Sequence, residues 1–152
     1  MPDYSIYWIE EEFHRHYFYR SDVLFRFLKQ CHLQPENEIL MKQFAYVVHQ
    51  VPVDRLLKHM KQCLAPGRFQ FEESRHISIQ TKGNKLNLFL GDRYLSGSSK
   101  SMEAAEEILF QTLRKFDRNF FIIETESEKY GWVSPVHKSY HRLNKQLLYS
   151  LL

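Results

Sequence analysis

The segment 68-RFQFEESRHISIQTKGNKLNLFLGD-92 decides the fold. It holds three short runs in which apolar and polar residues alternate, at 68–72, 76–81 and 86–90, and turn-forming residues separate them. Alternation with a period of two is typical of strands that bury one face. The Lys-Gly-Asn-Lys sequence at 82–85 is typical of a hairpin loop. Because strands joined by short loops pair antiparallel, the segment predicts an antiparallel sheet.

The residues before this segment predict one strand and four helices. Tyr4–Ile9 is rich in aromatic and β-branched residues, which favours a strand. Apolar residues then recur at helical spacing in four stretches, at about 10–18, 22–31, 35–48 and 53–64. Pro35 is expected to open the third helix, because proline is favoured at the first helical position. Four helices therefore precede most of the sheet.

The residues after the segment predict a loop, a helix and two strands. Gly97-Ser98-Ser99 is expected to form the loop, because these residue types are typical of turns. Ser101 is expected to cap a helix over 102–116. Phe120–Glu124 and Tyr130–Val133 are expected to be paired strands.

This order of elements, with three or four strands in the middle of the chain, predicts an α+β fold. We expect a single domain over residues 1–136, with a largely antiparallel sheet packed with the N-terminal helices and one later helix. Residues 137–152 are expected to form a C-terminal tail. Leucines at 143, 147 and 151 would share one face of a helix there.

Composition limits the classes of function. Hydrophobic residues make up 43% and charged residues 26% of the 152 residues, which indicates a soluble globular protein. The net charge of +3 is mild, and lysine and arginine are interleaved with glutamate, so direct binding to nucleic acid is not expected. The sequence has no apolar stretch of about 18 residues and no secretory signal pattern at its start. We therefore expect a cytoplasmic protein without membrane association.

Motifs for catalysis or metal binding are missing from the sequence. His14 and His16 would point apart on a helix, and His137 and His141 have no third ligand nearby. The Lys-Ser pair at 100–101 lacks the glycines of a phosphate-binding loop. We therefore expect no enzyme activity, no metal and no cofactor.

The aromatic residues offer a clearer signal. A single core cannot easily hold 12 Phe and 9 Tyr, and exposed aromatic residues commonly anchor protein interfaces. On the helix over 35–48, Gln43 lies about 80° and Tyr46 about 140° from the centre of the apolar arc. Tyr46 is thus either an exposed interface residue or is covered by the first helix. Phe13 and Tyr17 are four residues apart, and their spacing alone favours core packing.

Three blocks of the chain resemble the SirA family. They are YxIxEEFxxHYF at 7–18, KQxxY at 42–46 and YGWVxPV at 130–136. The blocks occur in the order typical of the family, and the resemblance spans about residues 4–138. The third block is expected to be structural, with Trp132 packing against the last strands.

The resemblance implies both an activity and a partner. SirA proteins inhibit the initiation of replication during sporulation by binding domain I of the initiator DnaA, and they are not enzymes. Carried over by motif, the binding residues would be Phe13, Tyr17, Gln43 and Tyr46. An inhibitor that binds DnaA domain I through this aromatic surface is therefore the expected function. The alternative is a nucleic-acid-binding module that uses exposed aromatic and scattered basic residues.

Overall fold

The computed structural model describes residues 3–64, 69–73, 75–81 and 83–134 of the chain. The tail predicted at 137–152 lies outside the described residues.

The helices and strands follow one another in the predicted order, with four strands where three or four were expected. The N-terminal half contains β1 (Asp3–Trp8), α1 (Glu11–Tyr17), α2 (Ser21–Leu33), α3 (Glu38–Val47) and α4 (Val53–Cys63). The four strands that come next are β2 (Phe69–Glu73), β3 (His76–Thr81), β4 (Asn84–Leu90) and β5 (Leu95–Ser99). The last elements are α5 (Met102–Ala105), the π-helical segment η1 (Glu106–Phe110), α6 (Gln111–Phe116), β6 (Phe120–Glu124) and β7 (Lys129–Trp132).

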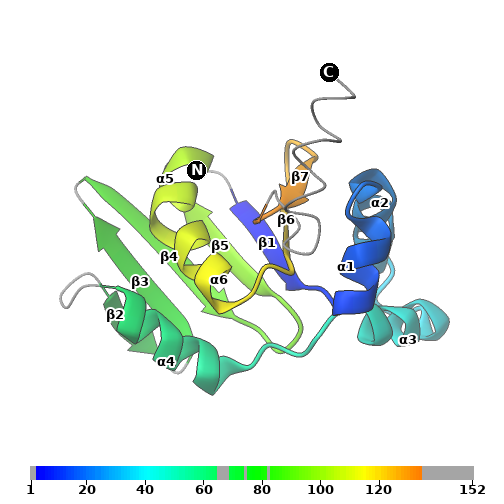
Figure 1. Ribbon diagram of the computed structural model, residues 1–152, viewed down its shortest axis with the longest axis horizontal. Helices are drawn as coiled ribbons and strands as arrows, with labels where there is room; N and C mark the ends of the chain where they lie inside the picture. Colours follow the sequence, from blue (N-terminus) through cyan, green and yellow to red (C-terminus); the bar gives the residue numbers. More distant parts are fainter. Residues whose placement is uncertain (1–2, 65–68, 74, 82, 135–152) are drawn as a thin grey trace, which may run out of the picture.

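The strands form one seven-stranded sheet in the order β2-β3-β4-β5-β1-β6-β7. Every neighbouring pair is antiparallel. The predicted α+β fold with an antiparallel sheet is therefore confirmed. The first strand of the chain, β1, lies inside the sheet between β5 and β6 (Figure 1).

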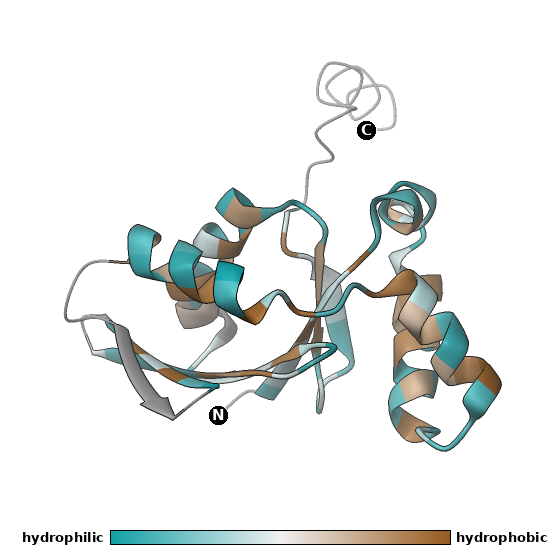
Figure 2. Ribbon diagram, turned by 90° about the horizontal axis from the view of Figure 1, so that it is seen from below, coloured by the Kyte–Doolittle hydropathy of each residue, from teal (hydrophilic) through white to brown (hydrophobic). Residues whose placement is uncertain are grey.

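Helices cover both faces of the sheet at β1 and β6. On one face, Ile6 and Ile122 pack with residues of α4 and of the helix α5–η1–α6. On the other face, Tyr7, Phe121 and Ile123 pack with the buried side of α2. Figure 1 shows α4 and α5–α6 over the part of the sheet built from β2 to β5, with α1, α2 and α3 grouped at the β6–β7 end. In Figure 2, apolar residues line the sides of the helices that face the sheet and one another.

The loop predicted at 97–99 is wrong, because these residues belong to β5, which pairs with both β1 and β4. The ring of Tyr4 lies directly over Gly97, where an added Cβ would come within 2.3 Å of Tyr4 Cε2. A glycine at this position therefore makes room for a ring. Gly97 is needed here for the packing of Tyr4, whereas its residue type had indicated a turn.

The boundaries of two helices also differ from the prediction. α3 begins at Glu38 instead of Pro35, and the Asn37 side chain caps it by accepting a hydrogen bond from Leu40 N at 3.1 Å. Ser101 caps α5 as predicted, with Ser101 Oγ 3.1 Å from Ala104 N. The helix expected over 102–116 is interrupted by the π-helical turn η1.

Candidate functional site

The four residues predicted to bind a partner line one groove between α1, α2 and α3. The groove has a volume of about 460 Å³, and we call it the aromatic groove. Its lining residues are Phe13, Tyr17, Phe27, Lys42, Gln43, Tyr46 and Val47. The fold thus brings together side chains from two blocks of sequence about 30 residues apart.

Three aromatic rings form a continuous wall of this groove. The Phe13 and Tyr17 rings on α1 are stacked, with centroids 6.4 Å apart and an interplanar angle of 15°. The Tyr46 ring on α3 meets Phe13 edge to face, at 5.9 Å and 78°. Edge-to-face and offset arrangements are the favoured geometries for aromatic pairs. The wall therefore holds its shape through contacts among its own rings.

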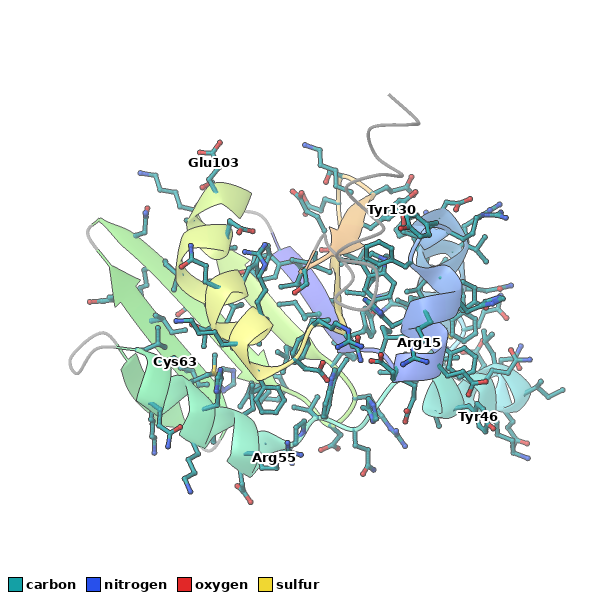
Figure 3. The ribbon with its side chains drawn as sticks, viewed as in Figure 1. Arg15, Tyr46, Arg55, Cys63, Glu103 and Tyr130 are labelled. Carbon is teal, nitrogen blue, oxygen red and sulfur yellow. The ribbon has the colours of Figure 1, made fainter. Side chains whose placement is uncertain are left out.

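Burial decides between the alternatives that the sequence leaves open. Tyr46 is 72% exposed, which confirms its outward position on α3 (Figure 3). Phe13 and Tyr17 are half-buried: both pack against the core cluster around Leu24 and Phe121, and both line the groove. Each of these two side chains therefore packs against the core on one side and faces the groove on the other.

Sequence reasoning missed three lining residues. Phe27 belongs to the apolar stripe formed by Leu24, Phe27, Leu28 and Cys31 in the helix expected over 22–31, but it is half-buried and forms part of the groove. It lies at the edge of that stripe, about 60° from Leu24 around the helix, and this angle was a usable signal. Val47 is buried beneath the groove, and Lys42 is exposed beside it.

Several contacts fix α1 relative to the rest of the fold. Glu10 N donates a hydrogen bond to Val47 O at 2.9 Å, which ties the start of α1 to the end of α3. At the other end of α1, Trp132 Nε1 donates to Phe18 O at 3.3 Å, and the Trp132 ring lies 4.4 Å from the buried ring of His14. The structural role predicted for Trp132 is thus confirmed. A groove held from both ends loses less conformational freedom when a partner binds.

Glu11 adds an electrostatic anchor at the start of α1. Its carboxylate accepts a hydrogen bond from Asn119 Nδ2 at 2.6 Å and forms an ion pair with Arg118, both of which precede β6. Burial alone would raise the pKa of Glu11. The Asn119 hydrogen bond and the positive charge of Arg118 outweigh that effect and hold the pKa below its usual value near 4.5. The ionised form of Glu11 therefore stabilises the folded state.

We expect Glu11→Gln to make the protein less sensitive to acid. Because the pKa is lowered in the folded state, the stabilisation by Glu11 is complete above about pH 4.5 and is lost as the pH falls through the lowered value. The difference in free energy of unfolding between wild type and Glu11→Gln should therefore shrink between about pH 6 and pH 3. Urea titrations over this range measure it, with Glu12→Gln, which removes an exposed carboxylate of the same turn, as control. A constant difference would contradict this role.

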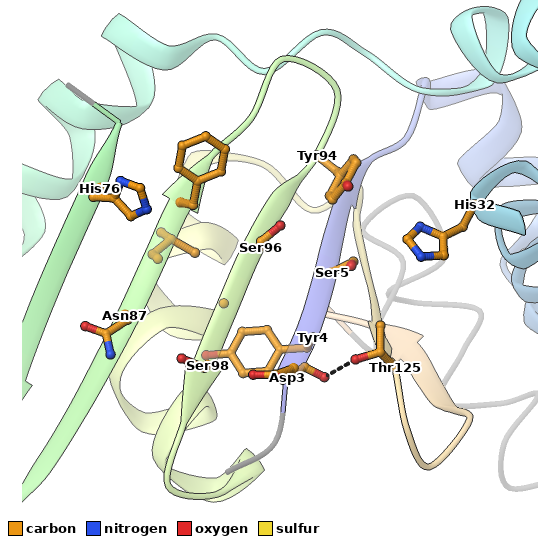
Figure 4. Close-up of a pocket in the computed structure, with 13 residues that line it drawn as sticks. Asp3, Tyr4, Ser5, His32, His76, Asn87, Tyr94, Ser96, Ser98 and Thr125 are labelled. Carbon is orange, nitrogen blue, oxygen red and sulfur yellow. Dashed lines mark hydrogen bonds between the residues drawn. The ribbon is translucent and has the colours of Figure 1, made fainter. Parts of the chain in front are cut away.

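A second hollow lies away from the aromatic groove. A pocket of about 380 Å³ lies on the sheet face formed by β3, β4, β5 and β1 (Figure 4). In that view, the hydrogen bond among the lining residues runs from Thr125 Oγ1 to Asp3 O, while His32 and His76 lie on opposite sides. Among the described residues, no group of three or more His, Cys, Asp or Glu side chains could hold a metal ion. None of the helices described is long and apolar enough to cross a membrane.

Comparison with known proteins gives two matches. The family model described as "Sporulation inhibitor of replication protein SirA" matches residues 2–137. The chain is also similar to the sporulation inhibitor of replication protein SirA of Bacillus subtilis (strain 168). The two are 26% identical over 138 residues, which cover 88% of this chain and 93% of the relative.

Proposed function

Because this chain belongs to the SirA family of sporulation inhibitors of replication, we propose that it inhibits the initiation of DNA replication by binding domain I of the initiator DnaA through the aromatic groove. The observation that carries the proposal is the convergence of Phe13, Tyr17, Gln43 and Tyr46 on one groove. Two of these residues come from the first SirA-like block and two from the second. A match to two separate sequence blocks does not by itself require the residues of the two blocks to lie close together in the fold.

The groove has the properties of an anchor site. Binding energy at protein interfaces is concentrated in a few residues, with tyrosine, tryptophan and arginine enriched among them. Here the half-buried rings of Phe13 and Tyr17 are already in place, and exposed Tyr46 stands beside them. We propose that an apolar side chain of DnaA domain I enters between these rings. The exposed amide of Gln43 offers both hydrogen-bond donors and an acceptor at the rim.

Inhibition by this route needs no chemical step. When the inhibitor occupies domain I, DnaA loses that surface for its own assembly and for other partners. The extent of inhibition then follows the concentration of the inhibitor relative to its dissociation constant. The protein acts in the cytoplasm, where it meets DnaA.

The arrangement of charges does not favour the nucleic-acid alternative. Several surface cations are already paired with carboxylates: Arg15 with Glu11, Arg20 and Arg26 with Asp22, Lys29 with Glu128, and Arg75 with Asp92. Each such pair leaves less positive charge to displace counterions from a phosphate backbone.

Calorimetric titration of the full chain with purified DnaA domain I tests the proposal. We expect saturable binding with one inhibitor bound per domain. The same titration with a DNA duplex, repeated at two salt concentrations, is the control. No binding to domain I at concentrations of tens of micromolar would contradict the proposal, and tight, salt-sensitive binding to DNA would favour the alternative.

A further inference from the structure

A separate apolar pocket lies behind α3, on the side turned away from the aromatic groove. It has a volume of about 420 Å³ and is enclosed by α2, α3 and the residues just before β5, and we call it the rear pocket. Met41, Phe44 and Ala45 line it from α3, and the α3 residues of the aromatic groove lie about 150° away around the helix. Sites for small molecules have volumes of about 300–1,000 Å³, so the rear pocket has the size of such a site.

The interior of the rear pocket is aromatic and uncharged. The buried Tyr7 ring meets Phe44 edge to face at 6.0 Å and lies 5.4 Å from the Tyr94 ring. Cys31 adds a buried thiol from α2. Burial raises the pKa of Cys31 to about 11 and that of Tyr7 to about 12, so both side chains are neutral near pH 7. The interior therefore suits an apolar body, and the aromatic rings give it flat surfaces for contact.

Arg93 brings a positive charge to this pocket. Its half-buried guanidinium lines the pocket, and Arg93 Nη1 donates a hydrogen bond to Val48 O at 3.5 Å. It forms no ion pair with any described carboxylate, and none of the lining residues is Asp or Glu. A guanidinium has five N–H donors, so the contact with Val48 leaves donors for an anion.

From these observations we infer that the rear pocket binds a small monocarboxylic acid, with the apolar body against the rings of Tyr7, Phe44 and Tyr94 and the carboxylate on Arg93. The forked guanidinium matches the two oxygens of a carboxylate. A second negative charge would enter an uncharged interior without a partner, which is costly, so acids with one charge are favoured. The inference goes beyond the proposed function and does not depend on DnaA.

Titration of the full chain with phenylpropionate and with octanoate tests the inference. We expect saturable binding of at least one of them with a dissociation constant of about 1 mM or lower. Phenylpropionamide has the same body as phenylpropionate without the charge, so it should bind at least tenfold more weakly. Equal affinities for the acid and its amide would overturn the role of Arg93, and no saturation by either acid would overturn the site.

Two variants test the two halves of the site. Arg93→Met should bind phenylpropionate at least tenfold more weakly than wild type while binding the amide as wild type does. Arg26→Met is the matched control, because Arg26 is exposed on α2 and does not line the pocket. Ala45→Phe should weaken binding of both compounds by filling the pocket, and since Ala45 is exposed the fold should be kept even if Arg93→Met unfolds. Full affinity in Ala45→Phe would overturn the site.

Methionine methyl groups labelled with ¹³C show where the acid binds. Met41 lines the rear pocket, whereas Met60 is buried in α4, in the other core cluster. The Met41 resonance should therefore shift as phenylpropionate is added, and the Met60 resonance should stay in place. Binding without a shift of Met41 would place the acid elsewhere. Contacts from the Met41 methyl group to leucines 143, 147 or 151 would mean that the chain itself fills the pocket, and either result would overturn the inference.

Discussion

Replacing Tyr46 with alanine is expected to lower the affinity for DnaA domain I at least tenfold while leaving the stability of the protein nearly unchanged. A tenfold loss corresponds to about 1.4 kcal/mol, which is modest for an aromatic anchor at an interface. Because Tyr46 is 72% exposed, its removal opens no cavity in the core. Surface changes of this kind shift the free energy of unfolding by about 0.5 kcal/mol or less. Calorimetric titration measures the affinity, and thermal unfolding measures the stability.

Two other variants make this test specific. Tyr19 is 64% exposed but does not line the groove, so Tyr19→Ala should bind domain I as wild type does. Phe13→Ala should lose both affinity and stability, because the Phe13 ring packs against the core and lines the groove. If Tyr46→Ala keeps full affinity, the aromatic groove is not the binding site. If it unfolds, the exposed position of Tyr46 is wrong.

Replacing Gly97 with alanine is expected to destabilise the fold by about 3 kcal/mol, because overpacking a rigid interior forces strain on its neighbours. The added Cβ would lie 2.3 Å from Tyr4 Cε2 and 2.8 Å from Tyr4 Cζ. The backbone of β5 cannot easily retreat, because it pairs with β1 on one side and β4 on the other. The Tyr4 ring cannot easily retreat either, since it is buried and meets Phe110 edge to face at 6.4 Å.

Gly131→Ala is the matched control for this prediction. Gly131 also lies in a strand, but an added Cβ there would meet nothing within 4 Å, and its φ is not in the left-handed region. Alanine at this position should therefore leave the stability unchanged or raise it by up to about 1 kcal/mol. Urea unfolding followed by circular dichroism measures both variants. Equal stabilities for the two would contradict the close packing of Tyr4 on Gly97.

The elements predicted correctly from sequence are those whose pattern is a local property of the chain. The alternation in β3 and β4 indicated strands with one buried face. The four consecutive apolar residues of β6 indicated a strand that is buried on both faces. β5 was missed because its glycine and serines lack such a pattern. The glycine, Gly97, makes room for the ring of Tyr4, more than 90 residues earlier in the chain. The start of α3 was misplaced because the helix begins after the Asn37 cap and not at Pro35.

The same distinction applies to the candidate site. The neighbouring positions of Phe13 and Tyr17, and the outward direction of Tyr46, follow from helical periodicity within single helices. The contact between the Phe13 and Tyr46 rings does not, because it depends on how α1 packs beside α3. Periodicity also cannot show that a side chain is half-buried, with one side against the core and another toward a groove. For Phe13 and Tyr17, the resemblance to the SirA family predicted a place on a binding surface, whereas their spacing alone favoured the core.

The position of β1 between β5 and β6 also bears on how the protein is made. During synthesis, Tyr4 has both of its pairing partners in the sheet only after Gly97 and then Glu124 have left the ribosome. Until then, α1 lacks the Asn119 and Arg118 partners of Glu11. A nascent chain therefore acquires the surface proposed to bind DnaA only after β6 has been synthesised. Chains interrupted before β6 would carry the helices of the aromatic groove without the strand that anchors α1.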